Sequence, residues 1–313
     1  MNHDQRKSWS GGSMHFIKGY KVSGSHAAHL LTTLAYTHDL NIDPTGGLKG
    51  GSINWNRYRS CVDVAGLDHP HKQFYKAVPV GFMKKYFCAD VVKFMFVRDP
   101  IERLWSAYNH YADWYKQKSS LDSFLKSQHS LLTSPHEMLS SSVKEALNFT
   151  RSLTILFQES MPESLVLLAV SANISICDLM YEPCDISAHD WAANKCNPDK
   201  RQISDNSRNM IKASKLYLYE KQFYDELKEV FLQETASGSF QQLLFKYKTL
   251  QNDALIACSN RVAVKAWENV LFADSKVKVT SGKIIRFRVY GANSPSILTG
   301  SLLCIQDYCR KHF

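Results

Sequence analysis

Apolar side chains recur along the chain with two different periods. Residues 91–97 form a nearly continuous run of apolar, β-branched and aromatic residues. Such a run predicts a strand that is buried on both faces, as in a parallel sheet. Pro100 then stands where a helix begins. One face of that helix is marked by Ile101, Leu104, Trp105, Tyr108, Tyr111, Ala112 and Tyr115.

A similar unit stands near the start of the chain. The short apolar segment His15-Phe16-Ile17 predicts a strand, and a loop of small and polar residues follows over 18–25. Helical spacing then links Ala27, Leu30, Leu31, Leu34 and Ala35. This unit is a strand, a loop and a helix.

The remaining pattern indicates an α/β fold. Further strands are predicted over 153–157, 178–181 and, from strict alternation, 285–290. Helices are predicted over 162–170, 216–230 and 240–255. We expect irregular structure over 43–62, a surface loop with one helical turn over 118–142, and a long loop over 184–209. Strands that alternate with helices favour a single domain with a central, mostly parallel sheet flanked by helices.

The charge balance favours an anionic partner. The 313 residues include 38 Lys and Arg against 29 Asp and Glu, which gives a formal net charge of +9. Nucleic acid, an anionic lipid surface, a phosphorylated cofactor and an acidic glycan all fit such a surplus. A scattered surplus is also common in proteins that bind no polyanion, so charge alone selects none of them.

Several classes of protein are disfavoured by what the sequence lacks. No apolar run is long enough to span a bilayer. Residues 1–13 are polar and carry no apolar signal core, so we expect a disordered lead-in and no membrane anchor in this chain. The eight cysteines form no CxxC pair, which disfavours zinc ribbons and thioredoxin-like sites. Their even number permits disulfides but selects no pairing.

Two triplets, Asn148-Phe-Thr150 and Asn173-Ile-Ser175, fit the acceptor pattern for N-glycosylation. They favour a secretory compartment.

The loop after the first strand has the features of an anion site. Backbone N–H groups at a helix start point toward a ligand, and the helix dipole favours negative charge. Lys21 adds an ammonium group, and Ser23 and Ser25 add hydroxyl donors. The loop lacks the GxxxxGK[ST] pattern, which disfavours an ordinary nucleotide triphosphatase. Alone, such a segment is usually only a turn and a helix cap.

A second segment strengthens the case for a phosphate. Arg98 stands just past the buried strand 91–97. Ligands of open α/β sheets bind outside the carboxyl ends of the strands. A guanidinium group there can hold a phosphate through paired hydrogen bonds. Ser106, about two turns into the following helix, can add a hydroxyl donor.

These segments resemble those of a known enzyme family. Residues 96–108 look like the 3′-phosphate-binding motif of carbohydrate sulfotransferases, in which Arg-Asp-Pro is followed by Arg and then Ser. Residues 16–31 resemble the 5′-phosphosulfate loop of the same enzymes. More narrowly, the chain looks like the galactose-3-O-sulfotransferases, including the galactosylceramide sulfotransferases. The matching residues include Phe16, Lys18, Lys21, Ser25, His71-Lys72-Gln73-Phe74, Glu163 to Leu168, Lys215 to Tyr219, and Phe223.

The resemblance runs over residues 14–257 and has departures. The hydroxyl residue that usually follows Ser25 is His26 here, and the usual Thr-His before Lys21 is Gly19-Tyr20. The resemblance implies a P-loop-like sulfotransferase domain over 14–257. Residues 258–313 are then an extension that packs on the same domain.

The same resemblance implies the cofactor 3′-phosphoadenosine 5′-phosphosulfate, with adenosine 3′,5′-bisphosphate as product and with no metal. Lys21 is assigned to the charge on the leaving phosphate, and Arg98 with Ser106 to the 3′-phosphate. Arg103 is expected to have a lesser role at the surface. The full set of expected cofactor-binding residues is Lys18, Lys21, Val22, Ser23, Gly24, Ser25, His26, Arg98 and Ser106.

A general base must take the proton of the acceptor hydroxyl, and histidine suits this role near neutral pH. His71 is the candidate, with His69 beside it; the alternatives are an exposed loop or a metal-binding pair. Glu163 either supplies a carboxylate to the site or starts a helix. His26 and His29 share a helix face, but without a third ligand they indicate no zinc site. The aromatic side chains over 105–115 form core or stack on adenine.

The sequence thus predicts sulfuryl transfer to a hydroxyl of a glycan or glycolipid, with galactose as one acceptor, in the Golgi lumen. The alternatives are a sulfotransferase for a small-molecule alcohol in the cytoplasm, or a P-loop-like kinase. Scattered basic residues disfavour a nucleic-acid binder. The sequence does not indicate an oligomeric state.

Overall fold

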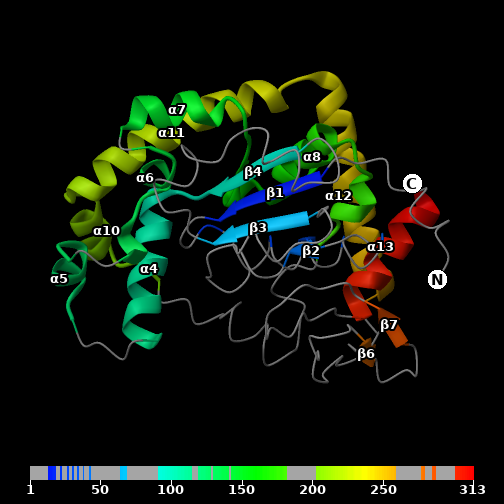
Figure 1. The fold of residues 1–313 in the computed structure, drawn as a ribbon, viewed down its shortest axis with the longest axis horizontal. Helices are drawn as coiled ribbons and strands as arrows, with labels where there is room; N and C mark the ends of the chain where they lie inside the picture. Colours follow the sequence, from blue (N-terminus) through cyan, green and yellow to red (C-terminus); the bar gives the residue numbers. More distant parts are fainter. Residues whose placement is uncertain are drawn as a thin grey trace.

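A five-stranded parallel sheet forms the centre of the molecule (Figure 1). The computed structural model describes residues 13–18, 22, 27, 30, 31, 34, 38, 42–43, 64–68, 91–114, 119–127, 130–140, 142–181, 202–258, 276–278, 284–286 and 300–313. The strands are β1 (Ser13–Lys18), β2 (Ile42–Asp43), β3 (Val64–Asp68), β4 (Val91–Val97) and β5 (Thr154–Phe157). Their order is β2-β3-β1-β4-β5, and all of them pair in parallel. This confirms an α/β fold with a parallel sheet.

The strand order places a crossover between β1 and β4. The strands that follow β1 in sequence, β2 and β3, lie on one side of it, whereas β4 and β5 lie on the other. β1 and β4 are direct neighbours, and their pairing runs from Ser13 opposite Val91 to Ile17 opposite Met95. Such a switch point is where open α/β sheets bind ligands, outside the carboxyl ends of the strands.

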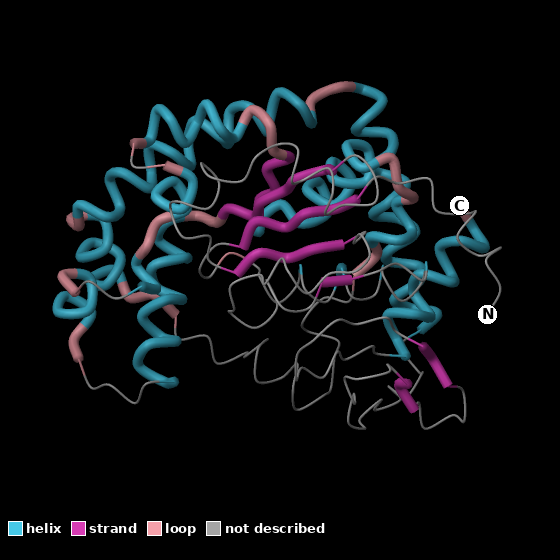
Figure 2. Tube along the Cα trace, viewed as in Figure 1, coloured by secondary structure: helices cyan, strands magenta, loops and turns pink. Residues whose placement is uncertain are grey.

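Helices surround the sheet (Figure 2). Four helices occur where the apolar spacing predicts them: α4 (Pro100–Trp114), α8 (Met161–Ala172), α11 (Lys215–Thr235) and α12 (Gly238–Cys258). Ala27, Leu30, Leu31 and Leu34 are helical and buried, as their spacing predicts. A further helix, α13 (Gly300–His312), lies near the end of the chain. The shorter helices and turns are α5 (Leu121–Leu125), η3 (Ser130–Leu132), α6 (Pro135–Leu139), α7 (Val143–Thr150), η4 (Gln158–Ser160), η5 (Ile176–Leu179) and α10 (Asp205–Lys212).

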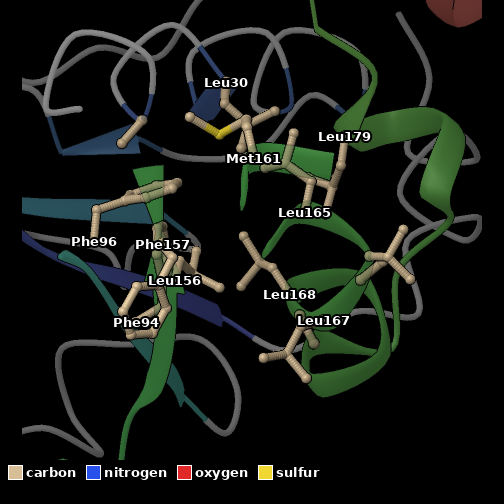
Figure 3. Close-up of a cluster of buried hydrophobic side chains, with 14 of the residues drawn as sticks. Leu30, Phe94, Phe96, Leu156, Phe157, Met161, Leu165, Leu167, Leu168 and Leu179 are labelled. Atoms are coloured by element: carbon tan, nitrogen blue, oxygen red, sulfur yellow. The ribbon is translucent and has the colours of Figure 1, made fainter. Parts of the chain in front are cut away.

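The main hydrophobic core lies between the sheet and α8. Phe94, Phe96 and Leu156 from the strands are at most 1% exposed. Figure 3 shows these side chains on one side of the cluster and those of α8, such as Leu165 and Leu168, on the other. Because α8 is apolar on nearly every face, it can pack in the centre of the domain.

A second hydrophobic cluster, separate from this core, packs α4 against α5, η3 and α10. Its buried members are Ile101, Leu104, Ala107, Leu121, Phe124, Leu125, Leu131, Leu132 and Ile211. Tyr108 and Tyr111 pack against Phe124, with ring centroids 5.8 and 4.7 Å apart. The expectation of a surface loop over 118–142 is therefore wrong. Its apolar residues fold as α5 and η3 against α4, whereas those of α6 pack with α7 and α11.

Two other expectations need correction, and a third, the strand over 285–290, is confirmed as β7 where the structure describes it. Residues 178–181 do not form a strand: η5 ends at Leu179, and the Ser175 hydroxyl caps it by accepting from the Cys177 N–H at 3.2 Å. Of the long loop expected over 184–209, the part from Asp205 onward is helix α10, whose N-cap is Ser204. Residues 184–201 lie outside the described residues. At the end of the chain, β6 (Lys276–Lys278) and β7 (Ile284–Arg286) form an antiparallel pair, and residues 287–290 lie outside the described residues.

Two disulfides fasten the C-terminal helix α13. Cys309 is bonded to Cys177 in η5, and Cys304 is bonded to Cys258 at the end of α12. In Figure 1, α13 lies beside α12, across the sheet from α4. The sequence permitted disulfides without selecting these pairs.

Within the described parts of the chain, no helix combines the length and the apolar character needed to cross a membrane.

Candidate functional site

The candidate site is the edge of the sheet where its strands end. The chain leaves β1 at Lys18, β3 at Asp68 and β4 at Val97, and these three strands are adjacent in the sheet. Lys18 and Asp68 are partners in the parallel register. The residues that follow these ends in sequence are the loop after Lys18, the His69 and His71 segment, and Arg98. The topology thus starts all three predicted segments at neighbouring strand ends.

Several predicted residues lie outside the described residues: Lys21, Ser23, Gly24, Ser25, His26, His69 and His71. The backbone of Lys18 is described as the last residue of β1. The side chain of Val22 is fully buried in the hydrophobic core. That burial leaves only the Val22 backbone to contact a ligand.

Asp99 explains why the Arg-Asp-Pro segment turns sharply from strand to helix. Its Oδ1 accepts hydrogen bonds from the N–H groups of Ile101 at 3.0 Å and Glu102 at 3.1 Å. It therefore caps two of the free donors at the start of α4. Pro100 occupies the first helical position, where its missing N–H costs nothing. These contacts hold Arg98 at the junction between β4 and α4.

Arg98 is a partly buried cation with one side-chain partner, Glu102, among the residues that the structure describes. Its side chain is 11% exposed, and its Nη2 lies 3.4 Å from Oε2 of Glu102. Burial lowers the pKa of Arg98, whereas the nearby carboxylates of Glu102, Glu159 and Asp99 act in the opposite direction. A guanidinium group carries five N–H donors in a planar fork. One long contact leaves most of that fork for an anion.

Glu159 and Tyr224 complete the surroundings of Arg98. Glu159 follows the end of β5, the strand next to β4, and accepts a hydrogen bond from the Tyr224 hydroxyl of α11. Lys228, one turn further along α11, lies 3.3 Å from the same hydroxyl. Burial and the hydrogen bond to Glu159 raise the pKa of Tyr224, so it stays a neutral donor. Sequence reasoning missed this pair because the two residues lie far apart in the chain.

Ser106 lies on the face of α4 that Arg98 contacts. Glu102, which is bonded to Arg98, stands four residues before Ser106, and residues at this spacing are neighbours on a helix surface. Ser106 is partly buried. The helix period thus puts Ser106 on the face of α4 that carries Glu102, the partner of Arg98.

Arg103 corrects the expectation of a surface residue. It is fully buried, and its guanidinium is bonded to both carboxylate oxygens of Glu220 in α11, with Nη2 to Oε2 at 2.6 Å. Its Nη1 donates to the carbonyl oxygen of Leu131 at 3.1 Å. With its donors satisfied, Arg103 fastens α4 to α11 and to η3. No signal in the sequence indicates Glu220 as its partner.

Glu163 lies in the first turn of α8, as the helix-start interpretation predicts. Its Oε1 is 2.7 Å from Nζ of Lys248 in α12. The carboxylate is thus engaged in an interhelical ion pair. No cluster of three potential metal ligands is found among the described residues.

Comparison with known proteins gives one match. Residues 56–165 fit the model of the sulfotransferase family, over about a third of the chain. The matched stretch contains His71, Arg98, Ser106 and Glu163. Neither the curated proteins nor the solved structures contain a match. The family match, together with an open parallel sheet and a partly buried arginine at its switch point, supports a sulfotransferase family and sulfuryl transfer in general for this chain.

Proposed function

We propose that this protein is an O-sulfotransferase that uses 3′-phosphoadenosine 5′-phosphosulfate and sulfates a hydroxyl of a glycan or glycolipid, with a galactose-like sugar as acceptor. The observation that carries the proposal is Arg98. It is a guanidinium that is 11% exposed at the switch point of a parallel sheet, with one long contact, to Glu102, among the described residues. The family match over residues 56–165 supports sulfuryl transfer.

The residues at this edge fit the phosphates of such a cofactor. Arg98, at the junction of β4 and α4, and Ser106, on α4, would offer donors to a 3′-phosphate. A guanidinium with spare donors can form paired, charge-assisted hydrogen bonds to a dianionic phosphate. Folding has already removed much of Arg98 from water, so less desolvation of the arginine opposes binding. The loop after Lys18, with Lys21, Ser23, Gly24, Ser25 and His26, would hold the 5′-phosphosulfate. The backbone of Val22 belongs to the same loop.

Each residue then has a defined task. When bound, the cofactor supplies an activated sulfuryl group. His71 accepts the proton of the acceptor hydroxyl as that oxygen forms its bond to sulfur. Lys21 stabilises the negative charge that develops on the departing phosphate oxygen. Arg98 and Ser106 fix the register of the nucleotide, which places the sulfur in line between the two oxygens.

The disulfides support a location in the Golgi lumen. Bonds such as Cys177–Cys309 and Cys258–Cys304 persist in oxidising compartments and are rare in the cytosol. We place the catalytic domain at residues 14–257. Residues 258–313 extend that domain, and the contacts of α13 with α12 and η5 support this arrangement.

Thermal stability in the presence of nucleotides tests the proposal. Adenosine 3′,5′-bisphosphate should raise the melting temperature much more than ATP does, because ATP lacks the 3′-phosphate that Arg98 would hold. Incubation with 3′-phosphoadenosine 5′-phosphosulfate and a panel of glycans, glycolipids and small alcohols should then yield a sulfated glycan or glycolipid. Equal shifts for the two nucleotides, or a greater shift with ATP and magnesium, would favour a kinase.

A further inference from the structure

We propose that Asn173 is an N-glycosylation site of the folded protein. The two acceptor triplets of the sequence have different surroundings in the structure. Asn173-Ile174-Ser175 lies in the turn between α8 and η5, and both Asn173 and Ser175 are exposed. Asn173 has a left-handed backbone, with φ 51° and ψ 48°, and it ends α8. Asn173 and Ser175 are thus both at the surface and outside the hydrogen-bonded turns of a helix. The Ser175 hydroxyl oxygen accepts from the Cys177 N–H at 3.2 Å, as the cap of η5.

The other triplet, Asn148-Phe149-Thr150, is built differently. Asn148 is exposed, but the whole triplet belongs to α7. Thr150 is 6% exposed, and its hydroxyl donates to the Leu147 carbonyl at 2.7 Å. Before an enzyme could engage this hydroxyl, the last turn of α7 would have to unwind. In the folded chain, the Asn173 triplet is therefore accessible to the enzyme, whereas the Thr150 hydroxyl of the Asn148 triplet is not.

The chemistry of the proposed modification is ordinary amide glycosylation. The Nδ2 atom of Asn173 forms a bond to the anomeric carbon of an oligosaccharide carried on a lipid diphosphate. The bond between that carbon and the diphosphate oxygen breaks, the lipid diphosphate leaves with the electron pair, and the amide nitrogen loses one proton to the enzyme. The disulfide of Cys177, two residues after the triplet, forms in the same oxidising pathway.

The position suits a large glycan. α8 begins beside the carboxyl end of β5 and runs for 12 residues, so Asn173 lies about 18 Å along the helix axis from that edge. A glycan there leaves the candidate cofactor site open. It can also shield Val170, which is 57% exposed and lies one turn before Asn173.

Translation of the full chain into microsomes, behind a cleavable signal sequence, tests the proposal. Only chains protected from protease and containing the Cys177–Cys309 bond are counted, which ensures translocation and folding. Enzymatic removal of N-glycans converts each modified asparagine to aspartate, and peptide mass spectrometry then locates it. We expect conversion at Asn173 in most of these chains.

Matched variants separate modification from the structural role of Asn173. Asn173→Gly keeps a residue suited to positive φ but removes the amide. It should lose the glycan and keep the disulfide. Ser175→Thr should retain the glycan, whereas Ser175→Ala should lose it. Oxidised chains with an unmodified Asn173, including chains modified at Asn148 alone, would overturn the proposal. The experiment measures glycan occupancy and not sulfuryl transfer, so its result does not depend on the proposed enzyme activity.

Discussion

At the scale of single residues, Arg98 and Arg103 show how position in the fold decides the role of a charge. Arg98 has one contact, at 3.4 Å, to a half-exposed carboxylate. Arg103 is fully buried and bonded to both oxygens of Glu220 and to the Leu131 carbonyl. The role proposed for Arg98 follows from its place after a buried strand, which the sequence predicts. The role of Arg103 depends on a partner 117 residues away, which no local pattern indicates.

Glu220 offers a test of that buried pair. Glu220→Ala should lower the free energy of unfolding by about 3–5 kcal/mol, because it leaves the Arg103 charge buried without its partner. Urea unfolding measures the loss. Glu226→Ala, at an exposed position of the same helix, should change the value by less than about 0.5 kcal/mol.

The double variant Arg103→Met with Glu220→Leu should recover much of the loss, since similar volume is then packed without charge. Equal, small effects of Glu220→Ala and Glu226→Ala would contradict the ion pair.

His71 provides the residue-scale test of the chemistry. His71→Ala should lower turnover by about 10²–10⁴-fold while the affinity for adenosine 3′,5′-bisphosphate changes little, because a base acts on the acceptor hydroxyl. His69→Ala should have a much smaller effect. Steady-state kinetics on the best acceptor of the panel, with nucleotide titration, distinguishes the two.

Lys21→Ala serves as a contrasting variant, since it should reduce turnover and also weaken nucleotide binding. Near-normal turnover of His71→Ala would place the base elsewhere, and Glu163 and His69 would be examined next.

At the scale of elements, the sequence predicts those parts whose local pattern agrees with their final burial. The run 91–97 is apolar except for Lys93 and becomes the interior strand β4, and α4 starts at Pro100 as expected. The errors occur where tertiary contacts decide. Residues 178–181 look like a short strand, but Cys177 is pinned to Cys309 and Ser175 caps η5. β3 and α13 were not predicted, since β3 is weakly apolar and α13 is fastened by disulfides.

The strand β1 carries a buried histidine whose titration is measurable. Burial, with a smaller effect of Lys93, lowers the pKa of His15 to about 3. Between that value and its ordinary pKa of 6.5, the unfolded chain binds a proton that the folded chain does not. Stability therefore falls as the pH drops below 6.5, by about 1.4 kcal/mol for each pH unit.

The variant His15→Leu lacks the pH-dependent contribution of His15 to the free energy of unfolding. Between pH 7 and pH 5, the free energy of unfolding of the wild-type chain should fall by about 2 kcal/mol more than that of the variant. Urea unfolding at the two pH values gives both differences. Parallel losses in the two chains would show that His15 is not excluded from protonation by the fold.

At the scale of the whole molecule, α13 joins the end of the chain to its middle. Cys177 and Cys309 are 132 residues apart, and Cys258 and Cys304 are 46 residues apart. Cross-links that close longer loops remove more entropy from the unfolded chain. Cys177→Ser with Cys309→Ser should therefore lower the free energy of unfolding by about 2–5 kcal/mol, and by more than Cys258→Ser with Cys304→Ser does.

Urea unfolding of the two double-serine variants in oxidising buffer gives this comparison. A larger loss for the shorter loop would contradict the entropic account.

The candidate site is a property of the whole sheet. Local patterns place Arg98, Ser106 and the loop after Lys18 at strand ends, but only the strand order shows that β1, β3 and β4 are neighbours. Glu102 could have been expected beside Arg98 from its spacing of four residues, whereas Glu159 and Tyr224 depend on how β5 and α11 pack. The acceptor specificity has no counterpart in any local pattern, because it is set by the shape of loops.

The central claim is that Arg98 at this edge holds a 3′-phosphate, and calorimetric titration tests it most directly. Adenosine 3′,5′-bisphosphate and adenosine 5′-monophosphate differ only in that phosphate. The wild-type chain should bind the bisphosphate about 30- to 150-fold more tightly, which corresponds to about 2–3 kcal/mol. Arg98→Ala should abolish most of this preference, and Arg151→Ala, at an exposed position, should keep it. Equal affinities in the wild-type chain, or an unchanged preference in Arg98→Ala, would contradict the account.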